Sequence, residues 1–264
     1  MGAEFRPPAL WLAENEVWLF RARDRWRARR SESFTVRTWL SSPVAWDGYT
    51  PIQIEGALQS AVIYLETGRT PDDVYSGIGE GFSPPTIPIA TKVIVAAGHS
   101  WPIHMVSSGI PAPCAVESLR WRRKRARADV LGVPGKLTVA GGWAKSLNLP
   151  LPTLATPWLD FHMVGDLDLV KRLLHDVRGL GRDASRGLGS VLGFEIREHE
   201  GSVLVANGVP LRSIPVDEGK SDLGINFDAC EVRPATTYAP YWHRASVTLC
   251  AVPKVRTLLE LDVA

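Results

Sequence analysis

Cysteine is scarce in this sequence, with three residues in a chain of 264. Cys114, Cys230 and Cys250 lie far apart, are odd in number and lack the paired spacing of zinc ligands. The pattern argues against a disulfide framework and against a zinc site, because both need paired or clustered cysteines. We therefore expect buried free thiols, no metal site and no cofactor.

Long apolar runs are also missing. No stretch reaches the roughly 18 apolar residues that a membrane span requires. The start, MGAEFRPPALWLAENE, lacks the charged-then-apolar order of a signal peptide. We expect a cytoplasmic protein with no membrane partner. The length is sufficient for a sizeable core, in one large domain or two small ones.

Net charge is low as well, at +2, but the basic residues are unevenly spread. Twelve of the 30 lysines and arginines lie in two segments, RARDRWRARR (21–30) and RWRRKRAR (120–127). Without these twelve residues and Asp24, 18 basic and 27 acidic residues remain, a balance of −9. Two such clusters in a near-neutral protein are typical of a localised surface that binds a polyanion.

The two clusters consist almost entirely of arginine, with Trp26 and Trp121 interleaved. A solvated face is the alternative interpretation, but such faces usually mix lysine with glutamate. Arginine clamps phosphate groups bidentately and stacks on bases, so we expect nucleic-acid contacts. The expected RNA contacts of the second cluster are Arg120, Trp121, Arg122, Arg123, Lys124, Arg125 and Arg127. The expected contacts of the first cluster, to RNA or DNA, are Arg25, Arg27, Arg29 and Arg30.

Hydrophobic periodicity predicts a mixed α+β fold. Alternating β-branched and aromatic residues predict a strand at 33–42, and the apolar spacing between Pro51 and Gly68 predicts an amphipathic helix. Similar patterns predict strands at 86–98, 100–108 and 158–165, a helix at 166–179 and a strand at 187–198. We expect an inserted loop around 129–157, where glycine and proline are frequent.

These elements suggest three parts of the chain. Residues 1–31 would form an Arg-rich N-terminal extension, and residues 32–200 the main domain with its inserted loop. Residues 201–264 would form a mostly β lobe packed on that domain.

The segment GLGRDASRGLGS (179–190) joins the second predicted helix to the strand behind it. A loop that holds cofactor phosphates instead precedes a helix, whose N-terminus supplies free N–H groups and a positive dipole end. Helix capping explains one or two of the glycines, whereas several glycines also let another backbone approach closely. We expect contacts to an extended phosphodiester strand from Gly179, Gly181, Arg182, Ser185, Arg186, Gly187 and Gly189.

This order of elements, with the glycine-rich segment between the last helix and the last strand, resembles the ferredoxin-like fold of CRISPR-associated RAMP proteins. More narrowly, the sequence is similar to the RAMP subunit of type IV CRISPR effector complexes that caps the guide RNA at its five-prime handle. The resemblance covers residues 33–253 and excludes the first 31 residues. Besides the glycine-rich segment it rests on SSPVAWDGYTPIQIEGALQSAV, on GGWAKSLNLPLP before WLDFHMVGDLDLVKRLL, and on GVPLRSIP followed by ATTYAPYWHRASVTLCAVP.

The resemblance implies a non-catalytic subunit that binds the guide RNA (crRNA). Its implied partners are the crRNA, the repeated backbone subunit and the large subunit of the complex, and target DNA near the handle. Bases splayed from a handle stack on aromatic side chains and arginine planes. Further expected RNA contacts are Trp143, Lys145, Tyr241 and Trp242. Packing of the C-terminal lobe is an equally good explanation of Tyr241 and Trp242.

RAMP proteins also include metal-independent endoribonucleases that process precursor crRNA, and this activity is the main alternative. Such cleavage needs a general base near the 2′-hydroxyl and a general acid at the leaving oxygen. The nuclease relatives commonly carry a histidine near the first helix, and residues 43–68 contain none. The sequence reveals no catalytic partner for any of its histidines: His99, His104, His162, His175, His199 and His243. An Arg- or Tyr-based cleavage site stays open as an alternative.

A third hypothesis is a structural protein that binds DNA or ribosomes nonspecifically. The position of the glycine-rich segment, between a helix and a strand, disfavours it.

Overall fold

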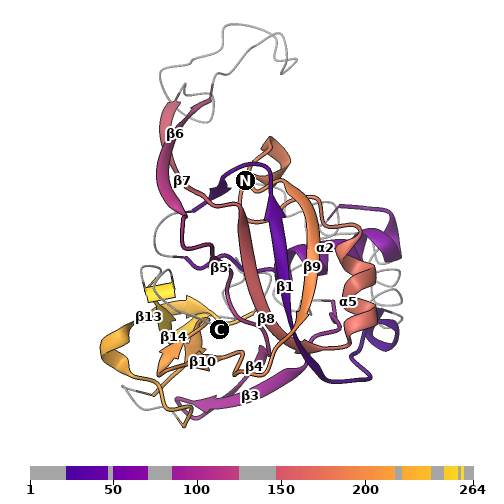
Figure 1. The fold of residues 1–264 in the computed structure, drawn as a ribbon. Coiled ribbons are helices and arrows are strands. Elements are labelled where there is room, and N and C mark those ends of the chain that lie inside the picture. The colour runs from indigo at the N-terminus through magenta and orange to yellow at the C-terminus, as the bar shows by residue number, and fades with distance from the viewer. Residues whose placement is uncertain are drawn as a thin grey trace, which may run out of the picture.

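The computed structural model describes residues 22–46, 50–70, 85–124, 147–217, 222–238, 247–254 and 257–258. In these residues strands outnumber helices, and the two kinds of element pack on each other (Figure 1). The predicted α+β class is confirmed.

A four-stranded sheet forms the centre of the main domain, with its strands in the order β5-β8-β1-β9. Neighbouring strands are antiparallel throughout. The strand bounds are β1 (Glu32–Leu40), β5 (Ile110–Pro111), β8 (Trp158–Gly165) and β9 (Val191–Glu198). The strands predicted at 33–42, 158–165 and 187–198 are therefore confirmed, the second with the same bounds and the other two with shifted or shorter bounds.

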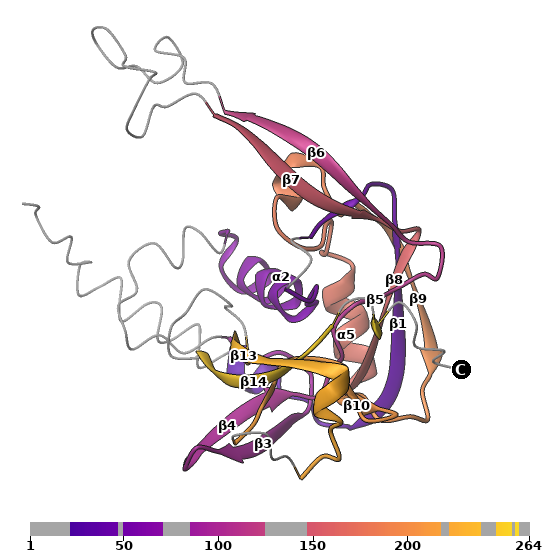
Figure 2. The same ribbon diagram turned by 90° about the vertical axis from the view of Figure 1, so that its left-hand side faces the viewer.

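Two helices, α2 (Glu55–Thr67) and α5 (Leu167–Leu174), lie on the same face of this sheet (Figure 2). Helix α2 ends at Gly68, whose φ of 67° is the left-handed conformation that glycine adopts without strain. Helix α5 begins after Asp166, whose side chain accepts a hydrogen bond of 3.2 Å from the backbone N–H of Leu169. Both predicted helices are confirmed, and both are shorter than the sequence pattern suggested.

The main core lies between the sheet and these helices. Alternate residues of the central strands point toward the helices, as the period of two in a strand requires. The buried residues include Phe34, Val36, Leu40, Leu159, Phe161 and Met163 from the strands, and Leu58, Val62, Val170 and Leu173 from the helices. Burial of each large apolar side chain stabilises the fold by roughly 1.5–3 kcal/mol.

Residues 22–31 pack against this core. Trp26 is fully buried in it, and the indole N–H of Trp26 donates to Glu66 of α2 at 2.8 Å. The guanidinium of Arg172 lies 5.5 Å from the centre of the same ring. This part of the predicted N-terminal extension is thus integrated into the main domain.

A long two-stranded ribbon extends away from the body of the protein (Figures 1 and 2). It consists of β6 (Val116–Lys124) and β7 (Leu147–Ala155), paired along their whole length, and β2 (Val44–Ala45) joins β7 at the base. The prediction of a loop was therefore wrong for residues 147–155. Pro150 and Pro152 concealed the strand in the sequence; proline is tolerated where one edge of a strand is unpaired, as β7 is beyond β2.

The remaining strands build a second, mostly β lobe. The hairpin of β3 (Thr91–Ala96) and β4 (His99–His104) confirms the two strands predicted before residue 108. The others are β10 (Val205–Ala206), β11 (Val209–Pro210), β12 (Ile214–Pro215), β13 (Cys230–Thr236) and β14 (Val247–Pro253). A separate apolar cluster that includes Ile103, Val203, Ile214, Ile225 and Ala251 holds this lobe together.

A buried ion pair joins the lobe to the main domain. Arg212 lies 2.9 Å from the carboxylate of Glu55 at the start of α2, and both side chains are almost completely buried. Arg212 also donates to the backbone oxygens of His104, Val106 and Thr237. Removal of one partner of such a pair leaves an uncompensated buried charge, so the pair fixes how the lobe sits.

All three cysteines are free. Cys230 and Cys250 are buried as expected, and burial raises the pKa of the Cys250 thiol to about 12. The expectation of burial was wrong for Cys114, which is exposed in a turn after β5.

Within the described residues no helix combines the length and the apolar character that a membrane crossing requires.

Candidate nucleic-acid interface

The second arginine cluster begins on β6 and is exposed there. Arg120 and Trp121 both point into solvent, and 61% of Trp121 is accessible. Leu119 on the same strand and Leu149 on β7 are exposed as well. Because successive side chains of a strand point to opposite faces, both faces of the ribbon present apolar surface to water.

No described acidic side chain forms an ion pair with Arg120. Four described arginines in other parts of the molecule differ, because Arg25, Arg37, Arg186 and Arg212 each have a carboxylate partner. The backbone of Arg122, Arg123 and Lys124 continues β6 opposite Leu149, Asn148 and Leu147. Among its described residues the ribbon therefore carries a guanidinium without an ion-pair partner on one face and an exposed indole on the other. Such groups bind phosphates and bases.

The glycine-rich segment runs from α5 to β9 and is held by its own backbone. Leu180 is fully buried, its N–H donates to Gly189 at 2.9 Å, and the N–H of Gly189 donates to Pro43 at 2.9 Å. A Cβ on Gly189 would lie 2.1 Å from the carbonyl oxygen of Leu180, so only glycine fits there. A Cβ on Gly179 or Gly181 would lie 3.0 Å from a side chain of this chain. Close packing thus explains three of the glycines: Gly179 and Gly189 pack within the segment, and Gly181 packs against Val44.

Three polar side chains of this segment are exposed: Arg182, Ser185 and Arg186. We call this exposed part of the segment its rim. Both arginines approach the carboxylate of Asp183, which is nearly buried: Arg186 is ion-paired with it, and Arg182 Nε lies 4.0 Å from it. One carboxylate faces two guanidinium groups, so the rim keeps a positive charge. Gly187 belongs to the same rim, and a Cβ added to it would meet no other atom within 4 Å.

The structure brings the ribbon and the glycine-rich segment to the same end of the molecule. Gly189 bonds to Pro43, and Gly181 contacts Val44 of β2, the strand that pairs with β7 at the base of the ribbon. Figure 1 shows both features above the central sheet.

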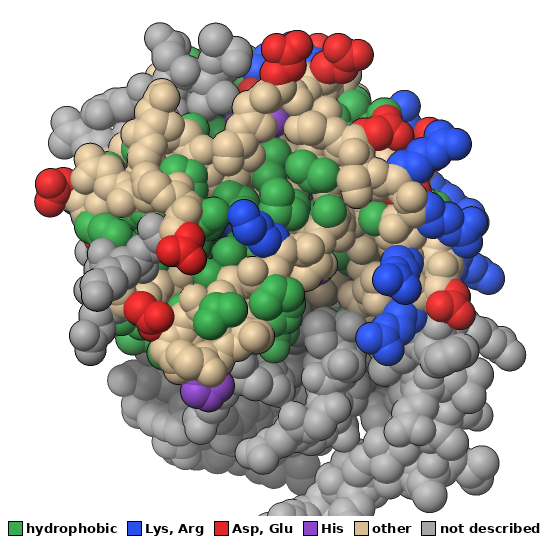
Figure 3. All heavy atoms as spheres, turned by 90° about the horizontal axis from the view of Figure 1, so that it is seen from below, with side chains coloured by type: hydrophobic (Ala, Val, Ile, Leu, Met, Phe, Trp, Pro, Cys, Tyr) green, Lys and Arg blue, Asp and Glu red, His purple; other side chains and the backbone are tan. Residues whose placement is uncertain are grey.

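The first arginine cluster lies elsewhere. Arg25 is paired with Glu66 at 2.9 Å, and the backbone N–H of Arg29 donates to Asp166 at 3.3 Å, beside α2 and α5. Arg27, Arg29 and Arg30 have exposed side chains. Figure 3 shows Lys and Arg side chains gathered along one edge of the molecule, on the side where α5 and this segment lie. The structure does not join this cluster to the ribbon.

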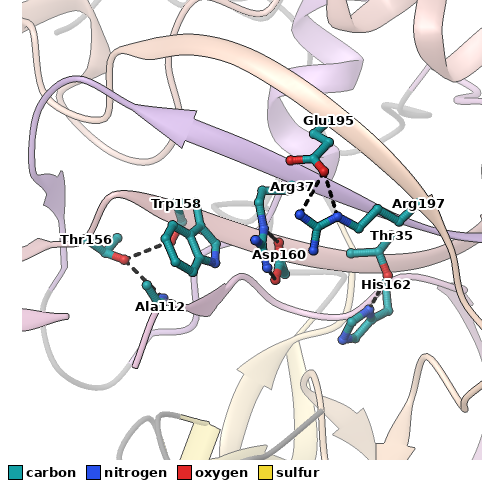
Figure 4. A network of polar contacts seen from close by, with 9 residues as sticks. All are labelled: Thr35, Arg37, Ala112, Thr156, Trp158, Asp160, His162, Glu195 and Arg197. Carbon is teal, nitrogen blue, oxygen red and sulfur yellow. Dashed lines mark hydrogen bonds and ion pairs between the residues drawn. The ribbon is translucent and has the colours of Figure 1, made fainter. Parts of the chain in front are cut away.

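A network on the sheet face opposite the helices escaped the sequence analysis (Figure 4). Arg37 donates two hydrogen bonds to Asp160, at 2.8 and 2.7 Å, and its guanidinium lies 4.4 Å from the ring centre of Trp158. The hydrogen bond to Asp160 raises the pKa of Arg37. Trp39 meets Trp158 edge to face, with ring centres 5.2 Å apart. The alternation of polar and aromatic residues along β1 and β8 was the available signal.

Two histidines are also brought together at this face. His162 and His199 stack with ring centres 4.1 Å apart, and Nδ1 of His162 bonds to the hydroxyl of Thr35 at 2.7 Å. Burial and the neighbouring His199 lower the pKa of His162 to about 4, and burial also lowers that of His199. Burial lowers the pKa of His104 to about 4 as well. The sequence did not reveal the pairing, because His162 lies on β8 and His199 follows the end of β9.

Other expected site residues lie outside the described part of the chain. These are Arg125, Arg127, Trp143, Lys145, Tyr241 and Trp242, together with His243. For the part that is described, no group of three or more His, Cys, Asp or Glu side chains is arranged to hold a metal ion.

Comparison with known families identifies the chain. The family model described as CRISPR type IV associated protein Csf3 matches residues 121–253. No curated protein matches the chain significantly. The matched residues begin on β6, include the glycine-rich segment and end with β14, and they make up half of the 264 residues. The chain belongs to the Csf3 family of type IV CRISPR-associated proteins, which confirms the resemblance to a type IV subunit.

Proposed function

We propose that this chain is a non-catalytic RNA-binding subunit of a type IV CRISPR ribonucleoprotein. In this role it caps the crRNA at its five-prime handle. There it contacts the repeated backbone subunit and the large subunit, close to the target DNA. Membership of a type IV CRISPR-associated family supports its place in such a complex.

The topology of the main domain supports the RAMP part of this proposal. Two strand-helix-strand units, β1-α2-β5 and β8-α5-β9, interleave to give the sheet order β5-β8-β1-β9. Both helices lie on one face. This order supports a ferredoxin-like domain, a fold on which many RNA-binding domains are built.

The ribbon is the observation that carries the proposal. An isolated two-stranded ribbon is marginally stable in water, and this one exposes Leu119, Trp121 and Leu149. A partner that offers both phosphates and bases pairs with Arg120 on one face of the ribbon and covers the indole of Trp121 on the other. Single-stranded RNA has this chemistry, whereas the bases of a duplex are stacked inside it.

The rim of the glycine-rich segment extends the same surface. Arg182 and Arg186 supply guanidinium donors and Ser185 a hydroxyl donor, all exposed at the end of the molecule that bears the ribbon. Donors of this kind form charge-assisted hydrogen bonds with phosphate oxygens. We assign them to the backbone of the handle.

The environment of the histidines supports a non-catalytic role. His162 is 5% exposed, and its lowered pKa keeps it neutral near pH 7. A general acid or base must come within hydrogen-bond distance of the reacting oxygen. The stacked pair of His162 and His199 is therefore a poor catalytic pair for RNA. The endoribonuclease alternative is tested directly by incubation with precursor RNA, as described in the Discussion.

The proposed function is tested by measuring the affinity of the full chain for a labelled crRNA. The double variant Arg120→Gln with Trp121→Ala should bind on the order of tenfold to a hundredfold more weakly, because a phosphate-binding group and a stacking surface are removed. Lys92→Gln with Val93→Ala is the matched control, since it removes an exposed basic and an exposed apolar side chain from the β3–β4 hairpin. Equal weakening by both variants, or by neither, would contradict the proposal.

A further inference from the structure

The sheet face that the helices leave uncovered carries an organised set of aromatic and charged side chains. Trp39 comes from β1 and Trp158 from β8, the two central strands of the sheet. The two indoles are half-buried and touch edge to face. Figure 4 shows Trp158, Arg37 and Asp160 side by side along the same face.

These side chains are held in place by their own contacts. The guanidinium of Arg37 lies over Trp158 and is fixed by two hydrogen bonds to Asp160. Glu195 accepts from Arg197 at 2.8 Å on the neighbouring strand β9, and this bond lowers the pKa of the carboxyl. Rigid planar groups lose little entropy when a ligand stacks on them, so the set is preorganised for a flat partner.

The charges of this face cancel. Arg37 is matched by Asp160, and Arg197 by Glu195. A phosphate gains little from a surface whose guanidinium groups are already neutralised by carboxylates. An uncharged planar group gains stacking surface on Trp39 and on the guanidinium plane of Arg37.

We infer that this face, defined by Trp39, Trp158 and Arg37, binds an unstacked base of single-stranded RNA. The ligand is a nucleobase rather than a phosphate, because the face offers planar indole and guanidinium groups, and the charges of the guanidinium groups are already paired with carboxylates. Aromatic side chains on the central strands of a four-stranded sheet bind bases in this way in other RNA-binding domains. The inference rests on the proposed function. It adds a base-stacking site separate from the ribbon and from the glycine-rich segment.

The first test is photo-crosslinking of the unaltered full chain to single-stranded RNA that contains 4-thiouridine. Peptides from β1 or β8 that include Trp39 or Trp158 should carry the cross-link. RNA bound only at the ribbon would give cross-links to β6 and β7 alone, and this result would overturn the inference. Because no substitution is made, the result does not depend on whether a variant folds.

The second test measures affinity at several salt concentrations. Trp39→Leu should weaken the binding of single-stranded RNA about tenfold, since the stacking surface for one base is removed. The dependence on salt should stay unchanged, because the phosphate-binding groups are all retained. Trp101→Leu is the control, as Trp101 is a half-buried indole on β4, away from this face. Equal affinities of Trp39→Leu and the unaltered chain would overturn the inference.

The outcomes separate this inference from the proposed function. If Arg120→Gln with Trp121→Ala weakens binding while Trp39→Leu does not, the proposed function stands and the sheet site falls. If the sheet cross-links form but the ribbon variant binds normally, the sheet site stands and the proposed interface is wrong. Absence of any RNA binding by the full chain would overturn both.

Discussion

The two arginine clusters are nearly identical in composition and opposite in environment. In the first, Trp26 is fully buried and Arg25 is paired with Glu66. In the second, Trp121 is 61% exposed and Arg120 has no carboxylate partner among the described residues. The difference lies in what surrounds each cluster: the first packs against α2 and α5, whereas the described residues of the second lie on a ribbon. An arginine-rich sequence therefore does not reveal whether its aromatic residues stabilise the fold or face a ligand.

The largest expected effect is on stability, and it separates the two tryptophans. Trp26→Ala should lower the free energy of unfolding by about 3–5 kcal/mol, because it leaves a cavity in the core and removes the indole N–H that donates to Glu66. Trp121→Ala should change that free energy by less than about 0.5 kcal/mol, as surface substitutions usually do. Urea denaturation followed by circular dichroism measures both. Similar losses for the two variants would remove the distinction between the clusters.

For RNA binding, substitutions in the second arginine cluster should have the larger effect. Replacing Arg122, Arg123 and Arg125 with glutamine should reduce the slope of log affinity against log salt by roughly two units, about 0.7 for each phosphate contact to a single strand. The same replacement of Arg25, Arg27 and Arg29 should have a smaller effect, because Arg25 is already neutralised by Glu66. Fluorescence anisotropy with labelled crRNA gives the slopes. An unchanged slope for the variant of Arg122, Arg123 and Arg125 would mean that these arginines face another partner.

The rim of the glycine-rich segment should contribute less. Arg182→Ala with Arg186→Ala should weaken the free energy of RNA binding by about 1–3 kcal/mol for each charge-assisted hydrogen bond to phosphate that the substitutions remove. The fold should be retained, because both side chains are more than half exposed. The measurement is crRNA affinity of the variant, with its circular dichroism spectrum as control. Undiminished affinity of a folded variant would rule out a role in RNA binding.

Acid should weaken the fold through His162. The pKa of His162 is lowered to about 4 by burial and by His199, with Asp160 acting in the opposite direction. In the unfolded chain His162 is protonated below about pH 6.5, whereas in the folded chain it stays neutral down to about pH 4. The free energy of unfolding therefore declines as the pH falls from about 6.5 to about 4. His162→Gln should flatten the decline in thermal melting experiments, whereas His175→Gln, at an exposed position, should not. Identical pH profiles for all three proteins would contradict this assignment.

The smallest expected effect is on RNA integrity. The purified chain, incubated with labelled precursor RNA in EDTA, should leave that RNA uncut, since metal-independent cleavage of the RAMP type survives EDTA. Gel electrophoresis reads the result. A single specific cut that a point substitution abolishes would favour the endoribonuclease alternative.

Local patterns predicted much of the fold. Alternation in β1 and β8 and the spacing of Leu58 and Val62 along α2 reflect one buried face each, and such periodicity is visible in a single sequence. The β7 strand was missed because Pro150 and Pro152 interrupt its pattern. Burial of Trp26 was missed because arginines surround it, although Ala22 lies four residues earlier, on the same face of a helical turn.

The sites were less predictable than the fold. The arginine clusters and the glycine-rich segment are continuous in sequence, so they were found as motifs. The Arg37–Asp160 pair and the stack of His162 and His199 each join residues that are distant in the chain. Such pairs depend on the register of the sheet, which a sequence without an alignment does not specify.

The central claim, that the ribbon binds the five-prime handle of a crRNA, is tested most directly by cross-linking in the assembled complex. The full chain would be purified with the RNA it carries, irradiated, and analysed both by sequencing of the RNA and by mass spectrometry of the peptides. The account predicts RNAs with a common five-prime end, cross-linked to the β6 peptide that contains Trp121. RNAs without a common end, or cross-links confined to residues 22–30, would contradict it.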